Sequence, residues 1–369
     1  MTKKKQTISG TGSKPLKVGF VPLADCAPVV MAYELGYFAK HGLKVELSRE
    51  LGWASVRDKL IHGELDASHA LAAMPVAATL GLGSIRSDCL TALVTSLHGN
   101  AITLSQDLWR KGVRDGATLR QEIRRHRGAK TFTFGVVYNF SSHRHQLRHW
   151  LSTHGIDPDK DVNLVVVPPP QMAKNLKAGH LDGFCCGEPW NSVAVASGAG
   201  WIVAASAELD PGHPEKVLMV RGSFAELQRE EHLRMVAAVY EACGYCSRPE
   251  NREQIIATLA RPYYVGVPGR VLSAFFEGRL NCGGPGQRDI PDFCVFNRGD
   301  SNRPSAEQAA WAFTLVRDSG LCPASILNSF SSVKNSYRSD LFDAATQPRP
   351  FHETRAQDDT QPEPNLIPA

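Results

Sequence analysis

The same unit occurs twice in this chain, and this repeat constrains the fold more than any other sequence feature. The first copy, residues 17–67, runs from KVGFVPL to GELDA, and the second, residues 131–184, runs from TFTFGVV to GHLDGF. In each copy an apolar strand leads into a polar turn and a helix that ends at His-Gly, and a second strand and a helix ending in Gly-x-Leu-Asp follow. Two similar βαβα lobes predict a cleft between them, where a ligand would bind.

Length and composition are those of an ordinary globular protein. A chain of 369 residues is long enough for two α/β lobes, each with its own core. The net charge of +4 is small for this length and gives no support to direct nucleic-acid binding. No apolar run approaches the roughly 20 residues that cross a bilayer, so we expect no membrane partner.

The N-terminus and the cysteines both predict a cytoplasmic location. The segment MTKKKQTISGTGSKP has a basic start but no apolar stretch of the kind that a secretory signal needs. A processed N-terminus would instead fit a periplasmic protein. The nine cysteines are an odd number without framework spacing, as expected of buried thiols in a reducing compartment.

Shifts in composition divide the chain into segments. We expect residues 1–16 to form a flexible leader, and residues 344–369, rich in Pro and Gln, to form a mobile tail. The first lobe is predicted to be discontinuous, with residues 17–105 joined by about 217–343, because the apolar strand VLMVRGSF returns to it. Residues 106–216 are expected to form the second lobe.

The second half of the chain is predicted to be mainly helical. Helical patterns cover residues 224–247 and 250–260, and Ser305 is placed to cap a helix over about 305–319. The stretch 278–293 is rich in Gly, Pro and Asn, which predicts irregular structure.

The turn after the first strand of the second copy has the features of an anion site. In a doubly wound sheet, ligands lie beyond the carboxyl ends of the strands and beside helix N-termini. Here Ser141, Ser142 and His143 combine two hydroxyls and an imidazole with free backbone N–H groups at the positive end of a helix. The alternative is that Ser141 or Ser142 only caps the helix and His143 faces solvent.

Four further residues stand at the boundaries of predicted elements. Glu188 follows the strand DGFCC, and Lys216 directly precedes the strand that returns to the first lobe. Trp53 and Asn100 lie in turns before a helix and a strand, respectively. Simpler explanations exist for three of them: Glu188 as a helix cap before a proline, Lys216 as an exposed lysine, and Trp53 as a core residue.

The sequence shows no catalytic constellation. Cys243 and Cys246 form a CxxC in an amphipathic helix, without the strand context of a redox motif or a second pair at zinc-site spacing. Cys185 and Cys186 are adjacent in a strand and point to opposite faces, so one metal ion cannot easily bind both. Phosphate-binding, dinucleotide-binding, metalloprotease and serine-hydrolase motifs are absent from the sequence. We therefore expect neither an enzyme nor a metal or cofactor.

Eight segments together resemble the nitrate/bicarbonate-binding family of ABC-transporter solute receptors and its cytoplasmic relatives. In chain order they are VGFVPLADCAPVVMAYELGYFAKHGL, GWASVRDKL, GELDA, HGNAI, SSHRHQLRHWL, GIDP, GEPWN and HPEK. The resemblance extends from about residue 17 to about residue 320. It implies an α/β, two-lobe periplasmic-binding-protein-like fold of type II, with a ligand cleft between the lobes.

The resemblance also implies which residues line the anion pocket: Trp53, Asn100, His143, Glu188 and Lys216. Family members often carry Gln at the position of Asn100, and the Asn side chain is one methylene shorter than Gln. In the expected mechanism nitrate or nitrite is desolvated between the lobes with Lys216 as its main counter-charge. His143 and Asn100 would donate hydrogen bonds from the two sides, and Glu188 would orient Lys216 or His143.

A regulatory role is implied as well. Without a recognisable signal, the chain is most similar to the cytoplasmic nitrate-sensor (NasS-type) branch of the family. Those proteins hold an RNA-binding antiterminator of the ANTAR type inactive, and nitrate or nitrite binding releases it. We therefore expect a nitrate/nitrite sensor that controls such a regulator of nitrate assimilation.

Three alternatives stay open at this point. The first is a substrate-binding protein of an ABC transporter for nitrate, nitrite or bicarbonate. The second is an enzyme related to the pyrimidine-forming proteins of thiamin biosynthesis, which share the fold but would need a cysteine-rich iron motif. The third is binding of an organic sulfonate or a pyrimidine, which the short, polar set of pocket residues disfavours.

Overall fold

The computed structural model describes residues 14–326 and 328–347. Most of the expected leader and the expected tail from residue 348 on therefore lie outside the described residues. The last described helix, α16 (Ser339–Thr346), includes the first residues of the segment expected to be a tail. No helix in the described ranges is long and apolar enough to cross a membrane.

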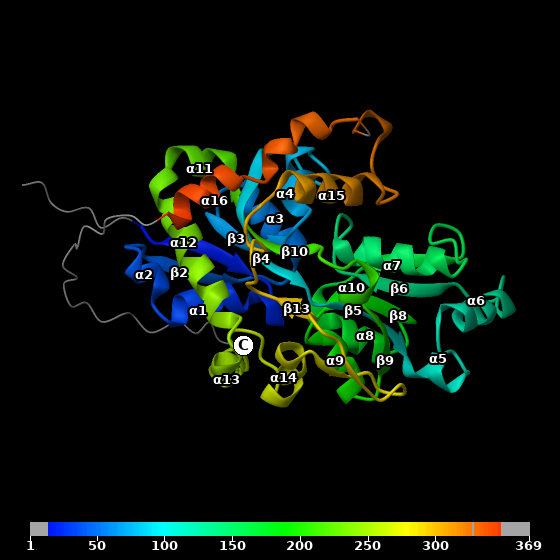
Figure 1. The fold of residues 1–369 in the computed structure, drawn as a ribbon. Helices are drawn as coiled ribbons and strands as arrows, with labels where there is room; N and C mark the ends of the chain where they lie inside the picture. Colours follow the sequence, from blue (N-terminus) through cyan, green and yellow to red (C-terminus); the bar gives the residue numbers. More distant parts are fainter. Residues whose placement is uncertain (1–13, 327, 348–369) are drawn as a thin grey trace, which may run out of the picture.

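Two β-sheets organise the chain, one in each lobe (Figure 1). The first sheet has six strands in the order β13-β4-β10-β3-β1-β2, and the second has five in the order β7-β6-β8-β5-β9. The strands of the first sheet are β1 (Leu16–Phe20), β2 (Val45–Arg49), β3 (Ala67–Leu71), β4 (Cys89–His98), β10 (Pro214–Arg221) and β13 (Cys294–Val295). Those of the second sheet are β5 (Asn100–Ser105), β6 (Phe132–Val136), β7 (Val162–Val166), β8 (Gly183–Gly187) and β9 (Gly200–Ala205).

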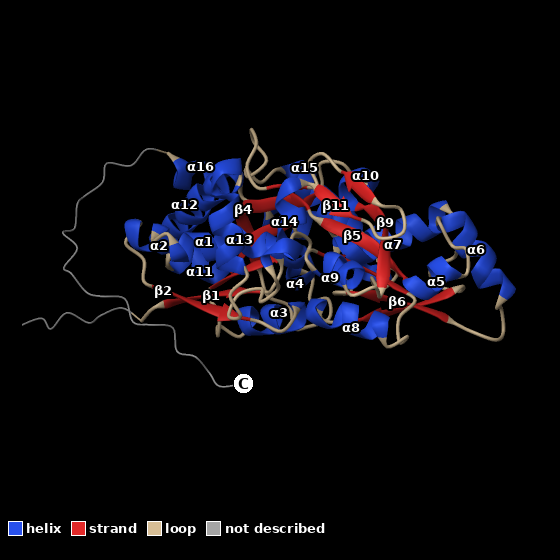
Figure 2. Ribbon diagram, turned by 90° about the horizontal axis from the view of Figure 1, so that it is seen from below, coloured by secondary structure: helices blue, strands red, loops and turns tan. Residues whose placement is uncertain are grey.

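Helices pack on both faces of the sheets, which confirms the expected α/β class (Figure 2). The first-lobe helices before the crossing are α1 (Ala27–Glu34), α2 (Tyr37–Lys40), α3 (Trp53–Ile61) and α4 (Met74–Thr79). The second lobe holds α5 (Gln106–Arg110), α6 (Gly116–Arg125), α7 (Ser142–Thr153), α8 (Met172–Lys177), α9 (Trp190–Ala196) and α10 (Ser206–Leu209). After the return strand come α11 (Gly222–Leu227), α12 (Arg229–Cys246), α13 (Arg252–Leu259), α14 (Gly269–Glu277), α15 (Ala306–Arg317) and α16. Ser305 caps α15 as predicted, because its side chain accepts a hydrogen bond from the Gln308 backbone N–H.

The repeat predicted from the sequence is present in the fold. In the first lobe β1 pairs in parallel with β2 and β3, and α1 and α3 form the connections. In the second lobe β6 pairs in parallel with β7 and β8, with α7 and α8 in the equivalent places. Equivalent turns after β1 and β6 thus face the junction between the lobes from opposite sides.

The matching glycines of the two copies allow neighbouring side chains to pack closely against strands β1 and β6. A Cβ atom on Gly19 would lie 2.6 Å from Leu65 Cδ1, and one on Gly135 would lie 2.8 Å from Met172 Sδ. Both distances are too short for real contacts, so a side chain at either position would displace its neighbours. The repeat therefore conserves a packing requirement within the molecule.

The crossing between lobes comes earlier than expected. Strand β4 leads into β5 through Gly99, and β5 belongs to the second sheet, whereas the sequence placed residues up to 105 in the first lobe. The turn is tight because His98 and Gly99 both have positive φ, at 59° and 96°. The return strand β10 joins the first sheet, as predicted, and pairs with β3 and β4.

One further expectation is wrong. The stretch 278–293 is not wholly irregular but contains a two-stranded antiparallel hairpin, β11 (Arg279–Asn281) with β12 (Gln287–Asp289). Its Gly- and Pro-rich composition is concentrated in the connecting turn, CGGPG, where Gly283 and Gly286 have positive φ. The turn residues at the centre of this stretch therefore led to a prediction of irregular structure, although two short strands flank the turn.

Two glycines provide a test of the packing. In Gly183→Ala the new methyl group would lie 2.8 Å from the Thr103 carbonyl oxygen and 2.9 Å from Phe134 Cδ1, so we expect a loss of about 1–3 kcal/mol in the free energy of unfolding. The matched control is Gly244→Ala in α12, where nothing lies within 4 Å of the added atom. Because alanine favours helix, this variant should gain up to about 1 kcal/mol. Urea denaturation of both variants measures the difference, and equal stabilities would contradict the packing described.

Candidate functional site

A buried lysine held by two carboxylates lies at the junction between the lobes. Lys216 is in β10 and is completely buried. Its Nζ lies 2.8 Å from Asp25 Oδ2 and 2.8 Å from Glu215 Oε1, and both carboxylates are also buried. Asp25 comes from the short 3-10 helix η1 (Ala24–Cys26) that follows β1. The predicted counter-charge is therefore already paired, and the trio carries one more negative than positive charge.

The electrostatics of the trio separate the two carboxylates. Burial alone would raise the pKa of Asp25, but the Lys216 ammonium and a hydrogen bond from His69 lower it to about 2. Burial likewise raises the pKa of Glu215, and here Lys216 reverses only part of the effect, so the pKa stays above its ordinary value. The two carboxylates outweigh the burial of Lys216 and raise its pKa. Lys216 and Asp25 are thus a fixed ion pair, and of the two carboxylates beside Lys216 only Glu215 has a pKa above its ordinary value.

Asn100 joins the second lobe to this trio. It begins β5, and its amide Nδ2 donates to Glu215 Oε2 at 2.7 Å and to Gln146 Oε1 at 3.2 Å. Its oxygen, Oδ1, has no hydrogen-bond partner among the described residues. A Cβ on Gly187, at the end of β8, would lie 3.5 Å from that oxygen and 3.7 Å from Asp25 Oδ2. The atoms of both lobes therefore converge beside Gly187.

His143 reaches the same place from the N-terminal turn of α7. Its side chain is fully buried, which excludes the alternative of a solvent-facing imidazole. Nδ1 lies 3.8 Å from Glu215 Oε1 and 3.4 Å from the Ser142 hydroxyl. Burial holds the pKa of His143 well below its usual value, so the free imidazole is neutral. Ser141 caps α7 by accepting from the Arg144 backbone N–H, so the capping explanation holds for Ser141 alone.

Trp53 closes the cluster on the first-lobe side. It opens α3, and Lys216 Nζ lies 5.6 Å from its ring centroid in a cation–π contact. The ring also packs against His69 at 5.5 Å, and His69 Nε2 lies 3.1 Å from Asp25 Oδ1. The indole N–H has no acceptor in the described ranges. The alternative of a plain core residue accounts for its burial but leaves this N–H unexplained.

The role expected of Glu188 requires correction. Its Oε2 accepts a hydrogen bond of 3.1 Å from the Ser192 backbone N–H at the start of α9. In the described part of the chain it forms no ion pair with Lys216 or His143. Free N–H groups and the positive end of the helix attract the carboxylate. The capping alternative considered above holds only for this contact, because the N-cap residue of α9 is Pro189 and not Glu188. Burial raises its pKa to about 7, and its backbone carbonyl accepts from the Ala24 N–H at 2.8 Å.

The cluster lies between lobes that touch each other. Arg57 in the first lobe donates to the Tyr138 hydroxyl in the second at 3.2 Å, and Trp190 Nε1 donates to the Pro22 carbonyl at 3.0 Å. On another side Arg144 Nε donates to the Ser319 carbonyl, after α15. The structure thus shows the lobes closed over the cluster, with four of the five predicted site residues in mutual proximity. Glu188 Oε2 is bound to the Ser192 N–H, and its Oε1 is buried without a hydrogen-bond partner among the described residues.

Four residues of this cluster were missed by sequence reasoning: Asp25, His69, Gln146 and Glu215. Glu215 was visible as the neighbour of Lys216, but consecutive residues in a strand normally face opposite sides. The register shift of β10 against β4 at Lys216 allows both to contribute. Asp25 lies in the turn after β1, where a ligand site is expected, and its polar character was the available signal.

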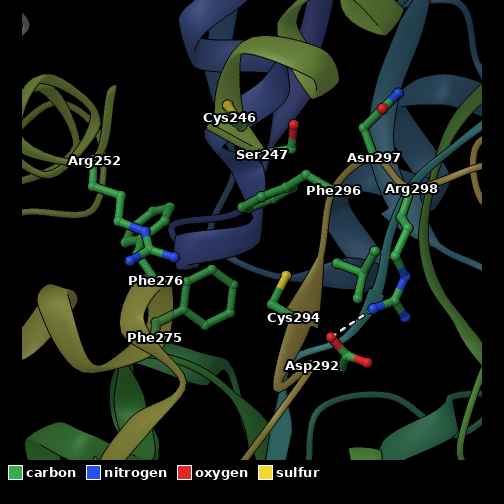
Figure 3. A pocket seen from close by; sticks show the side chains of 11 residues that line it. Cys246, Ser247, Arg252, Phe275, Phe276, Asp292, Cys294, Phe296, Asn297 and Arg298 are labelled. Carbon is green, nitrogen blue, oxygen red and sulfur yellow. Dashed lines mark ion pairs between the residues drawn. The ribbon is translucent and has the colours of Figure 1, made fainter. Parts of the chain in front are cut away.

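A separate cavity of about 200 Å³ opens at the surface beside α12, α13 and α14 (Figure 3). Phe276 and Phe296 stack in its wall with centroids 6.1 Å apart, and Arg298 pairs with Asp292 at 2.6 Å. None of the five predicted site residues lines it. Over the described ranges no group of three or more His, Cys, Asp or Glu side chains is placed to hold a metal ion.

Two sheets joined by crossing strands, with a polar cluster at the junction, define the class of periplasmic binding proteins. The crystal structure of the periplasmic nitrate-binding protein NrtA from Synechocystis PCC 6803 superposes with a TM-score of 0.85 and 27% identity, covering 90% of this chain and 88% of that one. The profile of the NMT1-like family matches residues 9–260, and the chain belongs to this family.

Curated relatives are similar over most of the chain. The nitrate import ATP-binding protein NrtC of Synechocystis sp. is 40% identical over 314 residues, which are 84% of this chain and 47% of that protein. The nitrate/nitrite binding protein NrtA of Nostoc sp. is 30% identical over 311 residues, 81% of this chain and 69% of that protein. The chain spans about half the length of the ATP-binding relatives it matches.

Proposed function

We propose that this protein is a receptor for nitrate, nitrite or bicarbonate that acts with an ABC transporter. The observation that carries the proposal is the buried cluster around Lys216, to which both lobes contribute. Its relatives are named for nitrate and for bicarbonate, and each of these ions is a small, planar, singly charged oxyanion. Binding here would be binding without catalysis, with Trp53, Asn100, His143 and Lys216 as ligand-contacting residues.

Unsatisfied polar atoms support a ligand at this place. Trp53 Nε1, His69 Nδ1, Asn100 Oδ1 and His143 Nε2 are buried and lack hydrogen-bond partners within the described residues, and Asp25 Oδ2 has only its ion pair with Lys216. A buried polar group without a partner costs about 1–3 kcal/mol, so this group of atoms in one cluster needs an explanation. An oxyanion between the lobes would satisfy the N–H groups and favour the closed arrangement, because it contacts both sides.

Calorimetric titration tests the proposal directly. We expect saturable heat for nitrate, nitrite or bicarbonate and none for sulfate at the same concentration, since a doubly charged ion meets a cluster that already contains two carboxylates. Absence of binding by all three singly charged ions would refute the proposed function.

Trp53→Phe probes the indole N–H. We expect the affinity for the bound anion to fall about tenfold, which corresponds to one hydrogen bond of about 1.4 kcal/mol. The matched control is Trp201→Phe in β9, because Trp201 is equally buried and its Nε1 also lacks a partner in the described ranges, but it packs against Trp109 away from the cluster. Equal losses of affinity in both variants would remove Trp53 from the site.

The sensor role is a second candidate. One observation favours it: all nine cysteines are free thiols, as suits the reducing cytoplasm. In that case an ANTAR-type RNA-binding regulator, not a transporter, would be the partner. Affinity capture from native lysate with and without nitrate distinguishes the two. Release of a small RNA-binding protein on adding nitrate supports the sensor, whereas retention of transporter subunits supports the receptor.

A further inference from the structure

The free cluster presents the wrong polarity to an anion at two positions. Asn100 uses its amide N–H groups toward Glu215 and Gln146, and leaves its oxygen without a donor. Nitrate and nitrite accept hydrogen bonds only, so the amide would have to rotate by half a turn to donate to either of them. The amide oxygen would then face Glu215 Oε2, 2.7 Å from the present nitrogen, and two acceptors at that distance repel unless one carries a proton.

His143 leads to the same requirement. If the neutral ring carries its proton on Nδ1, toward Glu215 and Ser142, then Nε2 offers a lone pair to the anion. If the proton is on Nε2, then the Nδ1 lone pair faces the Glu215 carboxylate at 3.8 Å. A proton added between Glu215 and His143 resolves both arrangements and leaves an N–H directed at the anion.

The net charge of the site makes the same demand. The positive charge of Lys216 is balanced by the negative charge of Asp25, and the negative charge of Glu215 remains uncompensated. An anion would therefore bring a second uncompensated negative charge into a buried space. Two unit charges 4 Å apart repel by about 4 kcal/mol even at an effective dielectric constant of about 20. Neutralising one carboxylate removes this cost.

We propose that the anion binds together with one proton from solvent, and that Glu215, in contact with His143 and Asn100, takes up that proton. The inference rests on the proposed function. No covalent bond changes, since the proton adds to a carboxylate oxygen and the Lys216–Asp25 ion pair stays ionised.

Glu215 is assigned as the acceptor because its carboxylate contacts both Asn100 and His143, the two side chains whose polarity must change. Lys216 Nζ at 2.8 Å, Asn100 Nδ2 at 2.7 Å, His143 Nδ1 at 3.8 Å and His213 Nδ1 at 3.6 Å face its oxygens. Further titratable groups near enough to feel its charge are Asp25, Cys185, Cys294 and Tyr337. Burial lowers the pKa of His213 to about 3 and raises those of the two thiols and the phenol, so these groups stay neutral.

The test is titration of the intact protein with nitrate from pH 5.5 to 9, because nitrate itself takes up no proton in this range. Above the pKa of Glu215 in the free protein, the Kd should rise about tenfold per pH unit, with uptake of about one proton measured from the dependence of the heat on buffer ionisation. Nitrate binding with a pH-independent Kd and no proton uptake would overturn the inference and leave the proposed function intact. No binding at any pH would overturn both.

Glu215→Gln supplies the matched variant. The amide can donate to Asn100 Oδ1 or His143 Nδ1 as a protonated carboxyl group would, so nitrate affinity at pH 9 should exceed that of the wild type and should no longer follow pH. Glu50→Gln is the control, because Glu50 is also buried but pairs with Lys59 in the first lobe. The Kd of this variant for nitrate should follow pH as in the wild type. A wild-type pH profile in Glu215→Gln would contradict the assignment, and the buffer measurement on the unmodified protein stands even if a variant fails to fold.

Discussion

Replacing Lys216 by methionine should lower the free energy of unfolding by about 3–5 kcal/mol, because it leaves the buried Asp25 carboxylate without its counter-charge. The ion pair is fully buried, and Lys216 and His69 hold the pKa of Asp25 at about 2, so the carboxylate stays ionised in the native protein. Removal of the ammonium forces it either to remain charged without a partner or to take up a proton. Chemical denaturation at pH 7 measures the loss.

A double variant separates this charge effect from a change in packing. Asp25→Asn keeps the shape of the side chain, and combined with Lys216→Met it should recover at least about 1 kcal/mol relative to the sum of the single changes. Lys40→Met is the surface control, because its ion pair with Glu241 is exposed and contributes less than about 1 kcal/mol. Additive losses in the double variant would show that the pair is not coupled.

The second large effect is loss of stability in acid through His232. This residue lies in α12, is buried against Phe224, and has no hydrogen-bond partner on either ring nitrogen within the described residues. Burial and the nearby Arg229 and Arg338 lower its pKa from 6.5 to about 4. The unfolded chain then binds the proton more tightly than the folded chain, so stability falls as pH falls from 6.5 toward 4, by about 3 kcal/mol for this group.

His232→Leu removes the titrating group without opening a large cavity. We expect the variant to be at least as stable as the wild type at pH 7.5, since two unsatisfied polar atoms disappear. Between pH 6.5 and 4, the free energy of unfolding of the variant should fall by about 3 kcal/mol less than that of the wild type. His62→Leu, at an exposed position, should keep the wild-type slope. An unchanged slope in His232→Leu would place the acid sensitivity elsewhere in the molecule.

The repeat, the α/β class and the return of β10 to the first lobe followed from sequence because each depends on local periodicity. The exact crossing at Gly99 did not, since a turn at Gly99 and Asn100 separates two strands but does not reveal that the second strand joins the other sheet. The hairpin around residues 279–289 was obscured by the glycines of its turn.

The candidate site was predicted in its location but not in its charge. Trp53, Asn100, His143 and Lys216 do converge, because each stands at an element end that faces the junction. The sequence could not reveal that Asp25 and Glu215 both reach Lys216, since one of these contacts is long-range and the other depends on a local irregularity of β10. Whether these residues hold an anion stays a prediction.

A crystal structure of the protein grown with nitrate tests the central claim most directly. We expect one nitrate at the junction of the lobes, within hydrogen-bond distance of Trp53 Nε1 and His143 Nε2 and close to Lys216. Crystals in which nitrate occupies only surface positions, while these side chains keep their present arrangement, would contradict it.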